Sequence, residues 1–212
     1  RNAGASYTVP GNTSSPFYTI DRWSVQSIGS NVFTTQQSST APVGFSTSLK
    51  ITVASAQSIG ASDYYMIQQG IEGYNISDLS WGTSSAKTVT LSFWVYSSLT
   101  GSFGGSLLNG AANRAYPFSY TISSANTWTK ISITIAGDTA GTWIGATNGT
   151  GVQITFGLGV GSTYSGTAGS WASATYVSST GATSVVGTSG ATFYITGVQL
   201  EKGSTATSFD YR

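Results

Sequence analysis

The sequence predicts an all-β protein in which two antiparallel sheets pack face to face and helix is negligible. Apolar residues recur at every second position in several segments, and this period is typical of strands with one buried face. Gly, Ser, Asn and Thr fill the connections, as at Thr100–Ser102 and Asn148–Thr150, and these residues favour turns. A sandwich of two sheets buries many one-sided strands. One short helical turn is expected near Asn75–Leu79.

The strand signals extend over most of the chain. Leu49, Ile51 and Val53 alternate with Lys50 and Thr52, and such residues fit a pleated, half-buried surface. The same alternation recurs in the ranges 89–95, 116–122, 131–135 and 152–160. None of these segments shows a 3.6-residue period, so we expect strands in all of them.

The final strand contains a break in its alternation at Gly197. Apolar residues before and after this glycine have opposite parity, and a β-bulge there would turn all of them toward the core: Phe193, Ile195, Val198 and Leu200. The alternative is that the strand ends at Gly197. Beyond it, residues 207–212 are expected to return along the domain with Phe209 as their apolar anchor.

The segment 161–190 is the least regular part of the sequence. Its Gly, Ser, Thr and Ala residues are compatible with disorder, but Tyr164, Trp171 and Tyr176 are interleaved among them. Aromatic residues are scarce in disordered chains. This composition therefore favours a long ordered loop, or an extra hairpin, packed on the sandwich.

Composition excludes several classes of function. The chain has neither cysteine nor histidine, which excludes disulfides, thiolate metal sites and Ser-His-Asp or Cys-His catalysis. Only 7% of residues are charged and the 8 Lys and Arg residues are scattered, so no nucleic-acid partner is expected. No run approaches the roughly 18 apolar residues of a membrane span, and no membrane partner is expected. The hydroxyl- and amide-rich surface suits neutral glycans or protein assembly.

The acidic residues are interpreted as structural. A glycosidase needs two facing carboxyl groups roughly 5 to 9.5 Å apart, but the 7 Asp and Glu residues are dispersed, with Lys or Arg beside several. Asp21 and Arg22 can approach Glu201 if the first and last strands pair, and a buried Arg22–Glu201 ion pair would fix the strand register. Calcium is the functional alternative, but no Asp-rich loop is present. We expect no catalytic residues, no metal and no cofactor.

The strand at residues 89–96 offers a candidate binding surface on its second face. That face alternates hydroxyl residues with two large aromatics, and an aromatic ring can stack on the apolar C–H patch of a sugar. Residues of other strands would join this surface if their side chains point to the same face and their strands are neighbours in the sheet. The candidates are Trp94, Tyr96, Trp128, Gln153 and Tyr194. The alternative is that they pack under loops or at an oligomer interface, where aromatics are also enriched.

Aromatic residues in the connections form a second candidate set, because loops carry binding function more often than strands do. These residues are Trp81, Trp143, Tyr164 and Trp171. The alternative is that they anchor the loops onto the sandwich.

Several segments resemble motifs of a family of bacteriophage structural proteins. They are QQGIEGYNISDLSWGT from Gln68, VTLSFWV from Val89, GDTAGTW from Gly137 and TFYITGVQLEKGSTATSFDYR from Thr192. In this order they resemble the carbohydrate-binding-module-like domain of phage tail fibres and other virion appendages. Ser208 stands where such motifs usually have proline before phenylalanine, which affects only the local turn.

This resemblance implies a single jelly-roll domain at residues 21–212, with residues 1–20 as a segment that joins upstream sequence. It also implies a homotrimer in an exposed virion appendage, beside other virion proteins, that contacts the surface polysaccharide of a bacterium or cyanobacterium. We therefore predict a tail-fibre module that binds host glycan without catalysis, with its sugar contacts away from the C-terminal motif. The alternative is a structural or decoration protein of the capsid or baseplate without a ligand; a depolymerase ranks last.

Overall fold

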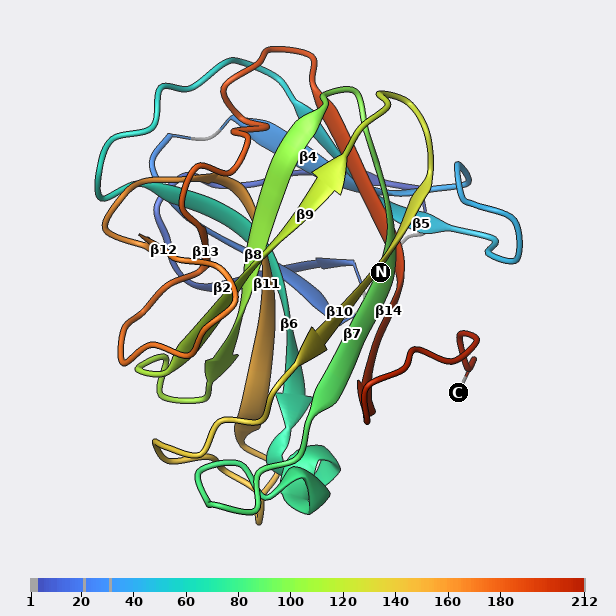
Figure 1. The fold of residues 1–212 in the computed structure, drawn as a ribbon. Coiled ribbons are helices and arrows are strands. Elements are labelled where there is room, and N and C mark those ends of the chain that lie inside the picture. The colour runs from blue at the N-terminus through green and yellow to red at the C-terminus, as the bar shows by residue number, and fades with distance from the viewer. Residues whose placement is uncertain (1–3, 21, 31, 212) are drawn as a thin grey trace.

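The alternating segments form two antiparallel sheets in the computed structural model, which describes residues 4–20, 22–30 and 32–211 (Figure 1). Sheet A has the order β1-β4-β5-β14-β7-β10, with β1 (Ser6–Thr8), β4 (Phe33–Ser38), β5 (Ser48–Val53), β14 (Thr192–Lys202), β7 (Val89–Ser97) and β10 (Thr129–Ile135). Sheet B has the order β2-β3-β6-β11-β8-β9, with β2 (Thr13–Ile20), β3 (Trp23–Ile28), β6 (Tyr64–Glu72), β11 (Thr150–Val160), β8 (Gly101–Asn109) and β9 (Ala115–Ile122). The predicted jelly-roll sandwich is confirmed.

Helix is confined, within the described ranges, to the 3-10 helix η1 (Gly73–Leu79), which includes the predicted turn. No helix in those ranges has the length and apolar character needed to cross a membrane. Strands β1 and β2 are edge strands of the two sheets, so the sandwich also uses chain that precedes residue 21. Asp21 itself lies outside the described residues.

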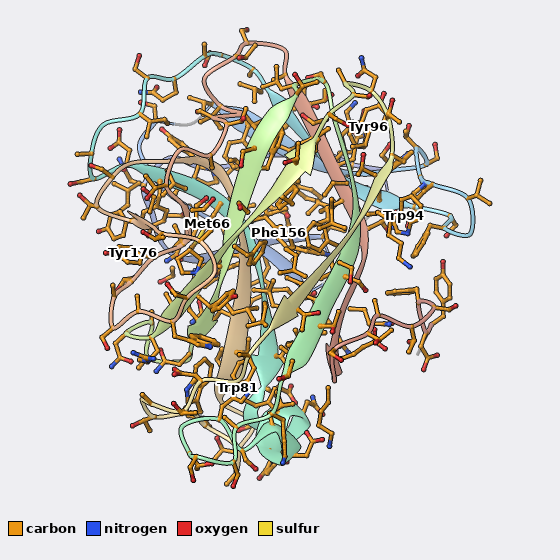
Figure 2. All side chains as sticks on the ribbon, viewed as in Figure 1. Met66, Trp81, Trp94, Tyr96, Phe156 and Tyr176 are labelled. Atoms are coloured by element: carbon orange, nitrogen blue, oxygen red, sulfur yellow. The ribbon has the colours of Figure 1, made fainter. Side chains whose placement is uncertain are left out.

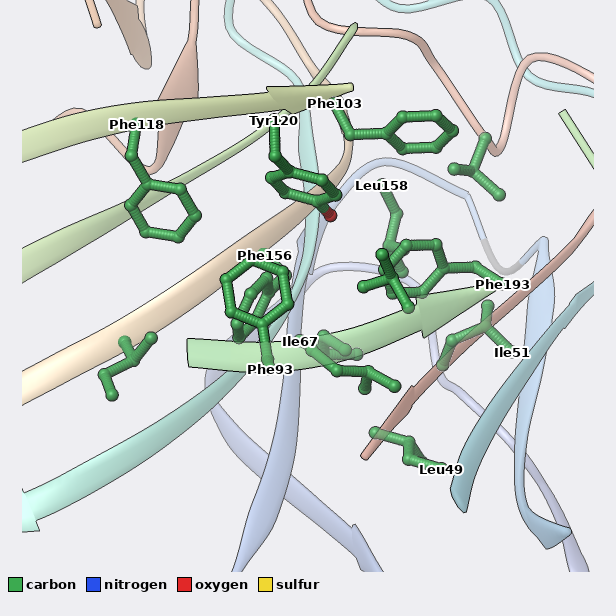
Figure 3. Packing of buried hydrophobic residues seen from close by; sticks show 14 of the residues in the cluster. Leu49, Ile51, Ile67, Phe93, Phe103, Phe118, Tyr120, Phe156, Leu158 and Phe193 are labelled. Carbon is green, nitrogen blue, oxygen red and sulfur yellow. The ribbon is translucent and has the colours of Figure 1, made fainter. Parts of the chain in front are cut away.

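Aromatic rings from both sheets meet in the centre of the core. The ring centroids of Phe93 in β7 and Phe156 in β11 are 5.0 Å apart, and those of Phe103 in β8 and Phe193 in β14 are 6.1 Å apart (Figure 3). All four side chains are at most 1% exposed. Full burial of a ring of this size contributes about 1.5–3 kcal/mol, so these cross-sheet contacts are a major part of what holds the sheets together.

The last strand, β14, lies between β5 and β7. Its register with β7 shifts between Thr196 and Gln199, where Gly197 has a φ of 60°. The predicted bulge is therefore confirmed, and the strand continues beyond the glycine. On both sides of it the apolar residues pack on the core: Phe193, Ile195, Val198 and Leu200.

The segment 161–190 covers much of the outer face of sheet B. It is an ordered loop rather than an antiparallel hairpin, because its two short strands, β12 (Ser165–Gly166) and β13 (Ser178–Ser179), pair in parallel. The Thr155 hydroxyl of β11 donates to the Val177 carbonyl at 2.8 Å, and Val177 is buried against Met66 and Leu108 of the sheet. Figure 2 shows Met66 and Tyr176 on this side of the sandwich. The chain itself therefore occupies this face over β8 and β11.

Gly104 of β8 allows the loop to reach the sheet, because a Cβ there would collide with the Oγ atoms of Ser178 and Ser179. We expect Gly104→Ala to displace the loop and to lower the free energy of unfolding by about 1–3 kcal/mol, as overpacking does elsewhere. Urea denaturation measures the change. Gly70→Ala, on the same face of β6, is the control, since its Cβ would meet nothing closer than 3.8 Å. Equal stability of the two variants would contradict this position of the loop.

Candidate functional site

The outer face of sheet A is polar and carries large aromatic side chains. The odd-numbered residues of β7 from Val89 to Val95 are buried in the core, so Trp94 and Tyr96 point outward. Figure 2 shows both on the side of the sandwich away from the loop 161–190. The register places Lys130 of β10 opposite Trp94 and Tyr194 of β14 opposite Tyr96. The predicted second face is therefore one surface across three neighbouring strands.

Three of the predicted residues form a cluster on this surface. The ring centroids of Tyr96 and Trp128 are 5.5 Å apart, those of Tyr96 and Tyr194 are 5.0 Å apart, and those of Trp128 and Tyr194 are 6.2 Å apart. Tilted and edge-to-face contacts of this kind are the preferred packing of aromatic rings, so each ring fixes the orientation of its neighbours. Tyr96 and Trp128 remain half-buried. We call these three residues, together with half-buried Trp94, the aromatic platform.

Gln153 does not join the platform. It lies on β11 of sheet B, where it pairs with Gly70 of β6 and Leu108 of β8. β11 is therefore not a neighbour of β7, and Gln153 was expected on this surface only if the two strands were neighbours.

The C-terminal tail, residues 203–211, folds back along sheet A (Figure 1). Its residues line one side of a groove over Trp94. Figure 1 shows the tail at the right of the molecule, on the same side as the connection between β4 and β5. The groove has a volume of about 350 Å³, within the range of small-ligand sites. Sheet A contributes Ser92, Trp94, Lys130 and Gly197, and the walls are Val43–Phe45, Thr207–Phe209 and Tyr211.

The bulge at Gly197 makes room for one wall of this groove. A Cβ at Gly197 would lie 2.6 Å from Cζ of Phe45 and 3.4 Å from Cδ1 of Trp94. Phe45 in turn contacts Phe209 and Tyr211, with ring centroids 5.1 and 5.7 Å away. Phe209 and Tyr211 are 4.8 Å apart. We call these three rings the tail cluster; the expected anchor Phe209 is one of them.

Two polar side chains of β14 hold the tail in place. Oε2 of Glu201 accepts a hydrogen bond from the Thr207 amide at 3.0 Å, and Oε1 accepts one from the Thr207 hydroxyl at 2.6 Å. Oε1 of Gln199 accepts a hydrogen bond from the Asp210 amide at 3.0 Å. The Tyr211 hydroxyl donates to the Gly44 carbonyl. The tail is thus tied both to the strand that precedes it and to the β4–β5 connection.

The C-terminal motif supplies a wall of this groove, whereas the sequence predicts that the sugar contacts lie elsewhere. Sequence reasoning also missed Phe45 and Tyr211 as groove residues. Phe45 stands in an irregular connection, where no period indicates its neighbours. The one available signal was Gly197, since a glycine in a strand also marks close approach of another chain segment.

The tryptophans of the second candidate set anchor loops at one end of the sandwich. Trp81, Trp143 and Trp171 contact each other edge to face, with centroid distances of 4.7, 5.4 and 5.4 Å. Each indole N–H donates to a backbone carbonyl; the acceptors are Lys87, Ala140 and Ala136. Tyr164 lies elsewhere and packs against Tyr64 at 5.0 Å. This geometry favours the loop-anchoring alternative for the three tryptophans.

Two acids are in ion pairs among the described residues, Arg114–Asp138 and Lys202–Asp78, each at 2.6 Å, as the structural interpretation of the acids predicts. The predicted buried Arg22–Glu201 pair is wrong. Arg22 is exposed and lies between β2 and β3 of sheet B, whereas Glu201 is on β14 of sheet A and binds Thr207. No group of three or more acidic residues in the described ranges is arranged to hold a metal ion.

A larger open groove of about 810 Å³ runs between η1 and the second half of β14. Its charged residues include Asp78 and Lys202, which pair with each other, and Glu201, which holds the tail. No tryptophan is among the described residues that line it. It therefore lacks the tryptophan on which a sugar ring could stack in the groove over Trp94.

No family model and no curated protein matches the chain. Among solved structures, the fold is similar to the enzymatically active domain of tailspike protein 4 of bacteriophage CBA120, with 15% identity and a TM-score of 0.49 over 87% of this chain and 20% of that one. It is also similar to a putative sugar binding protein from Bacteroides thetaiotaomicron (12% identity, TM-score 0.47, 92% and 94% of the two chains). A third similar structure is the family 11 carbohydrate-binding module of a Clostridium thermocellum cellulosomal cellulase (12% identity, TM-score 0.45, 98% and 100%).

The chain spans about a fifth of the tailspike structure. At identities of 12 to 15%, these similarities concern the fold and transfer no function to this chain. Its function is therefore inferred from its own residues.

The attachment of the tail is expected to depend on pH through Glu201. Partial burial acts to raise the pKa of this carboxyl, but hydrogen bonds with Thr207 and Gln199 and the charge of Lys130 outweigh that effect and lower the pKa below 4.5. Because the folded-state pKa lies below the ordinary value, the ionised carboxylate stabilises the attached tail at neutral pH. This contribution is lost as the pH falls below 4.5 and through the folded-state pKa.

We therefore expect the amide resonance of Thr207 to move, and its hydrogen exchange to accelerate, as the pH falls through this range. NMR spectroscopy of the labelled protein measures both. In Glu201→Gln the tail should already be loosened at neutral pH and should show no such transition. A Thr207 amide that stays unchanged in acid would refute this role of Glu201.

Proposed function

We propose that this chain is a non-catalytic glycan-binding module of an exposed virion appendage, most specifically a tail fibre. The observation that carries the proposal is the groove on sheet A, where Trp94 and the tail cluster face the polar groups of Ser92, Lys130 and Thr207. A sugar ring presents an apolar C–H face and a rim of hydroxyl groups. Apolar ring faces beside a few donors and acceptors are suited to such a ligand.

The aromatic platform extends this site beyond the groove. The rings of Tyr96, Trp128 and Tyr194 hold one another at 5.0 to 6.2 Å, so these side chains lose little freedom when a ligand binds. The contacts are shallow and each one is weak. A single module would therefore bind reversibly, and tight attachment would come from several copies acting together.

The virion setting rests on the resemblance of the sequence motifs to those of phage appendage proteins. In that setting a homotrimer would present three grooves to the surface polysaccharide of a bacterium or cyanobacterium, while other surfaces contact further virion proteins. Tethered copies bind a repetitive polymer at high effective concentration, which compensates for weak individual sites.

A ligand-free structural or decoration protein of the capsid or baseplate is the second candidate. Val43 is 101% exposed and Tyr211 is 65% exposed at the outer end of the tail cluster, and exposed apolar groups also suit protein interfaces. In this case the platform would be covered by a neighbouring subunit. Location in a virion reconstruction separates the two functions, since a tip position favours glycan binding and a lattice position favours the structural role.

The non-catalytic part of the proposal is supported by the acids. No Asp or Glu is among the described residues that line the groove over Trp94, so no carboxyl pair flanks a bound sugar there. Incubation of the protein with host polysaccharide should release no oligosaccharide. Released fragments detected by chromatography would overturn this part.

A glycan array followed by titration tests the binding function. We expect saturable binding to a bacterial polysaccharide and an affinity at least tenfold lower, or about 1.4 kcal/mol, for Trp94→Ala, because this change removes the ring at the bottom of the groove. Tyr74→Ala is the matched control, since Tyr74 is 61% exposed on η1, away from the groove. Circular dichroism checks that both variants are folded. Unchanged binding by folded Trp94→Ala would rule out the groove as the site.

A further inference from the structure

We infer that the groove and platform select glycans that carry anionic groups, carboxylate or sulfate, over neutral glycans. This inference rests on the proposed glycan-binding function and names the chemical class of its ligand. It comes from the placement of two lysines, Lys130 and Lys50, on this face, neither of which is in an ion pair among the described residues.

Lys130 supplies the charge of the groove. Of the described residues that line the groove over Trp94, it is the one with an ionic side chain. It lies directly opposite Trp94 in the register of β10 and β7, and it is exposed. A sugar stacked on Trp94 would therefore have an ammonium group at its edge. A hydrogen bond from an ammonium group to a carboxylate or sulfate oxygen is stronger than one to a neutral hydroxyl.

Lys50 supplies a charge to the platform. It pairs with Tyr194 in the register of β5 and β14, and its Nζ atom lies 5.7 Å from the centroid of the Tyr194 ring. This distance is within the range of a cation–π contact, which holds the ammonium group above the aromatic surface. Lys50 is also half-buried, so its long side chain is confined. Tyr194 itself is buried, so an anionic sugar would lie on the neighbouring half-buried ring of Tyr96 and would meet a charge already in position there.

Glu201 is an acid whose charge reaches this surface, because Lys130 lowers the pKa of its carboxyl. Both carboxylate oxygens of Glu201 accept hydrogen bonds from Thr207, which ties the carboxylate to the tail. Neither Lys50 nor Lys130 belongs to an ion pair among the described residues, since the pairs there are Arg114–Asp138 and Lys202–Asp78. Both ammonium groups can therefore accept an anionic ligand without first breaking a salt bridge.

The two lysines are separated by three strand-to-strand steps, from β5 through β14 and β7 to β10. At about 4.8 Å per step the separation across the sheet is roughly 14 Å. One monosaccharide is too small to reach both. The spacing therefore fits a polymer with repeated acidic groups, in which separate residues of one chain contact Lys50 and Lys130.

The test compares polymers that differ only in charge. The probes are polygalacturonate beside its carboxyl-reduced form, and dextran sulfate beside dextran. We expect the full chain to bind at least one acidic probe at least tenfold more tightly than its neutral partner. Lys130→Gln and Lys50→Gln should each weaken that binding at least fivefold. Binding should also weaken between about 0.1 and 0.5 M salt, because exposed charges are screened.

Lys87→Gln is the matched control, because Lys87 is exposed in the segment before β7 and does not line the groove. It removes the same charge and should change nothing. Equal binding of the acidic and neutral forms, or equal binding by Lys50→Gln, Lys130→Gln and Lys87→Gln, would overturn the anionic preference. If Trp94→Ala still abolished binding in that case, the glycan-binding function would stand. No binding to any probe or to any glycan on the array would overturn both.

Discussion

The pairing of the last strand with two strands from the first half of the chain is the interaction on which the rest of the structure depends. β14 lies between β5 and β7, and without it sheet A would separate into β1-β4-β5 and β7-β10. Ile195 pairs with Leu49 on one side and with Val95 on the other. Because such pairings are distant in sequence, they close late and slowly in folding. The platform depends on the same insertion, since it brings Tyr194 between Lys50 and Tyr96.

The bulge in β14 reconciles two demands on that strand. Its first half must turn Tyr194 outward with Phe193 and Ile195 inward, whereas its second half must bury Val198 and Leu200 and turn its polar residues outward. One extra residue at a φ of 60° reverses the alternation between these halves. Gln199 and Glu201 then reach the tail, and the missing side chain of Gly197 leaves the space that Phe45 fills. Core closure and groove shape therefore share one backbone irregularity.

The sequence predicts the features that depend on local alternation and fails where the neighbours are set by topology. The segment 89–95 was predicted as a strand because its buried face is apolar at every second residue. β8 was not predicted as a strand, because Gly104 and Gly105 interrupt its alternation. Its first residue, Gly101, also lies in a segment whose residues favour a turn. The alternation of inward and outward residues made Tyr194 and Gln153 equally good candidates for the platform. Only strand order, which parity does not contain, assigns one to sheet A and the other to sheet B.

The preference for anionic over neutral glycans depends on where the few charges of the chain lie, which the composition does not show. A net charge of +1 and 7% charged residues suggested a neutral partner, because the molecule as a whole has little field to attract an anion. In salt solution, however, a bound ligand senses mainly the charges within about 10 Å. Neither Lys50 nor Lys130 is in an ion pair among the described residues, so a ligand beside either one senses its charge, although Lys130 also acts on the Glu201 carboxylate. Lys50 and Lys130 beside aromatic rings therefore give this face a discrimination that the average composition does not predict.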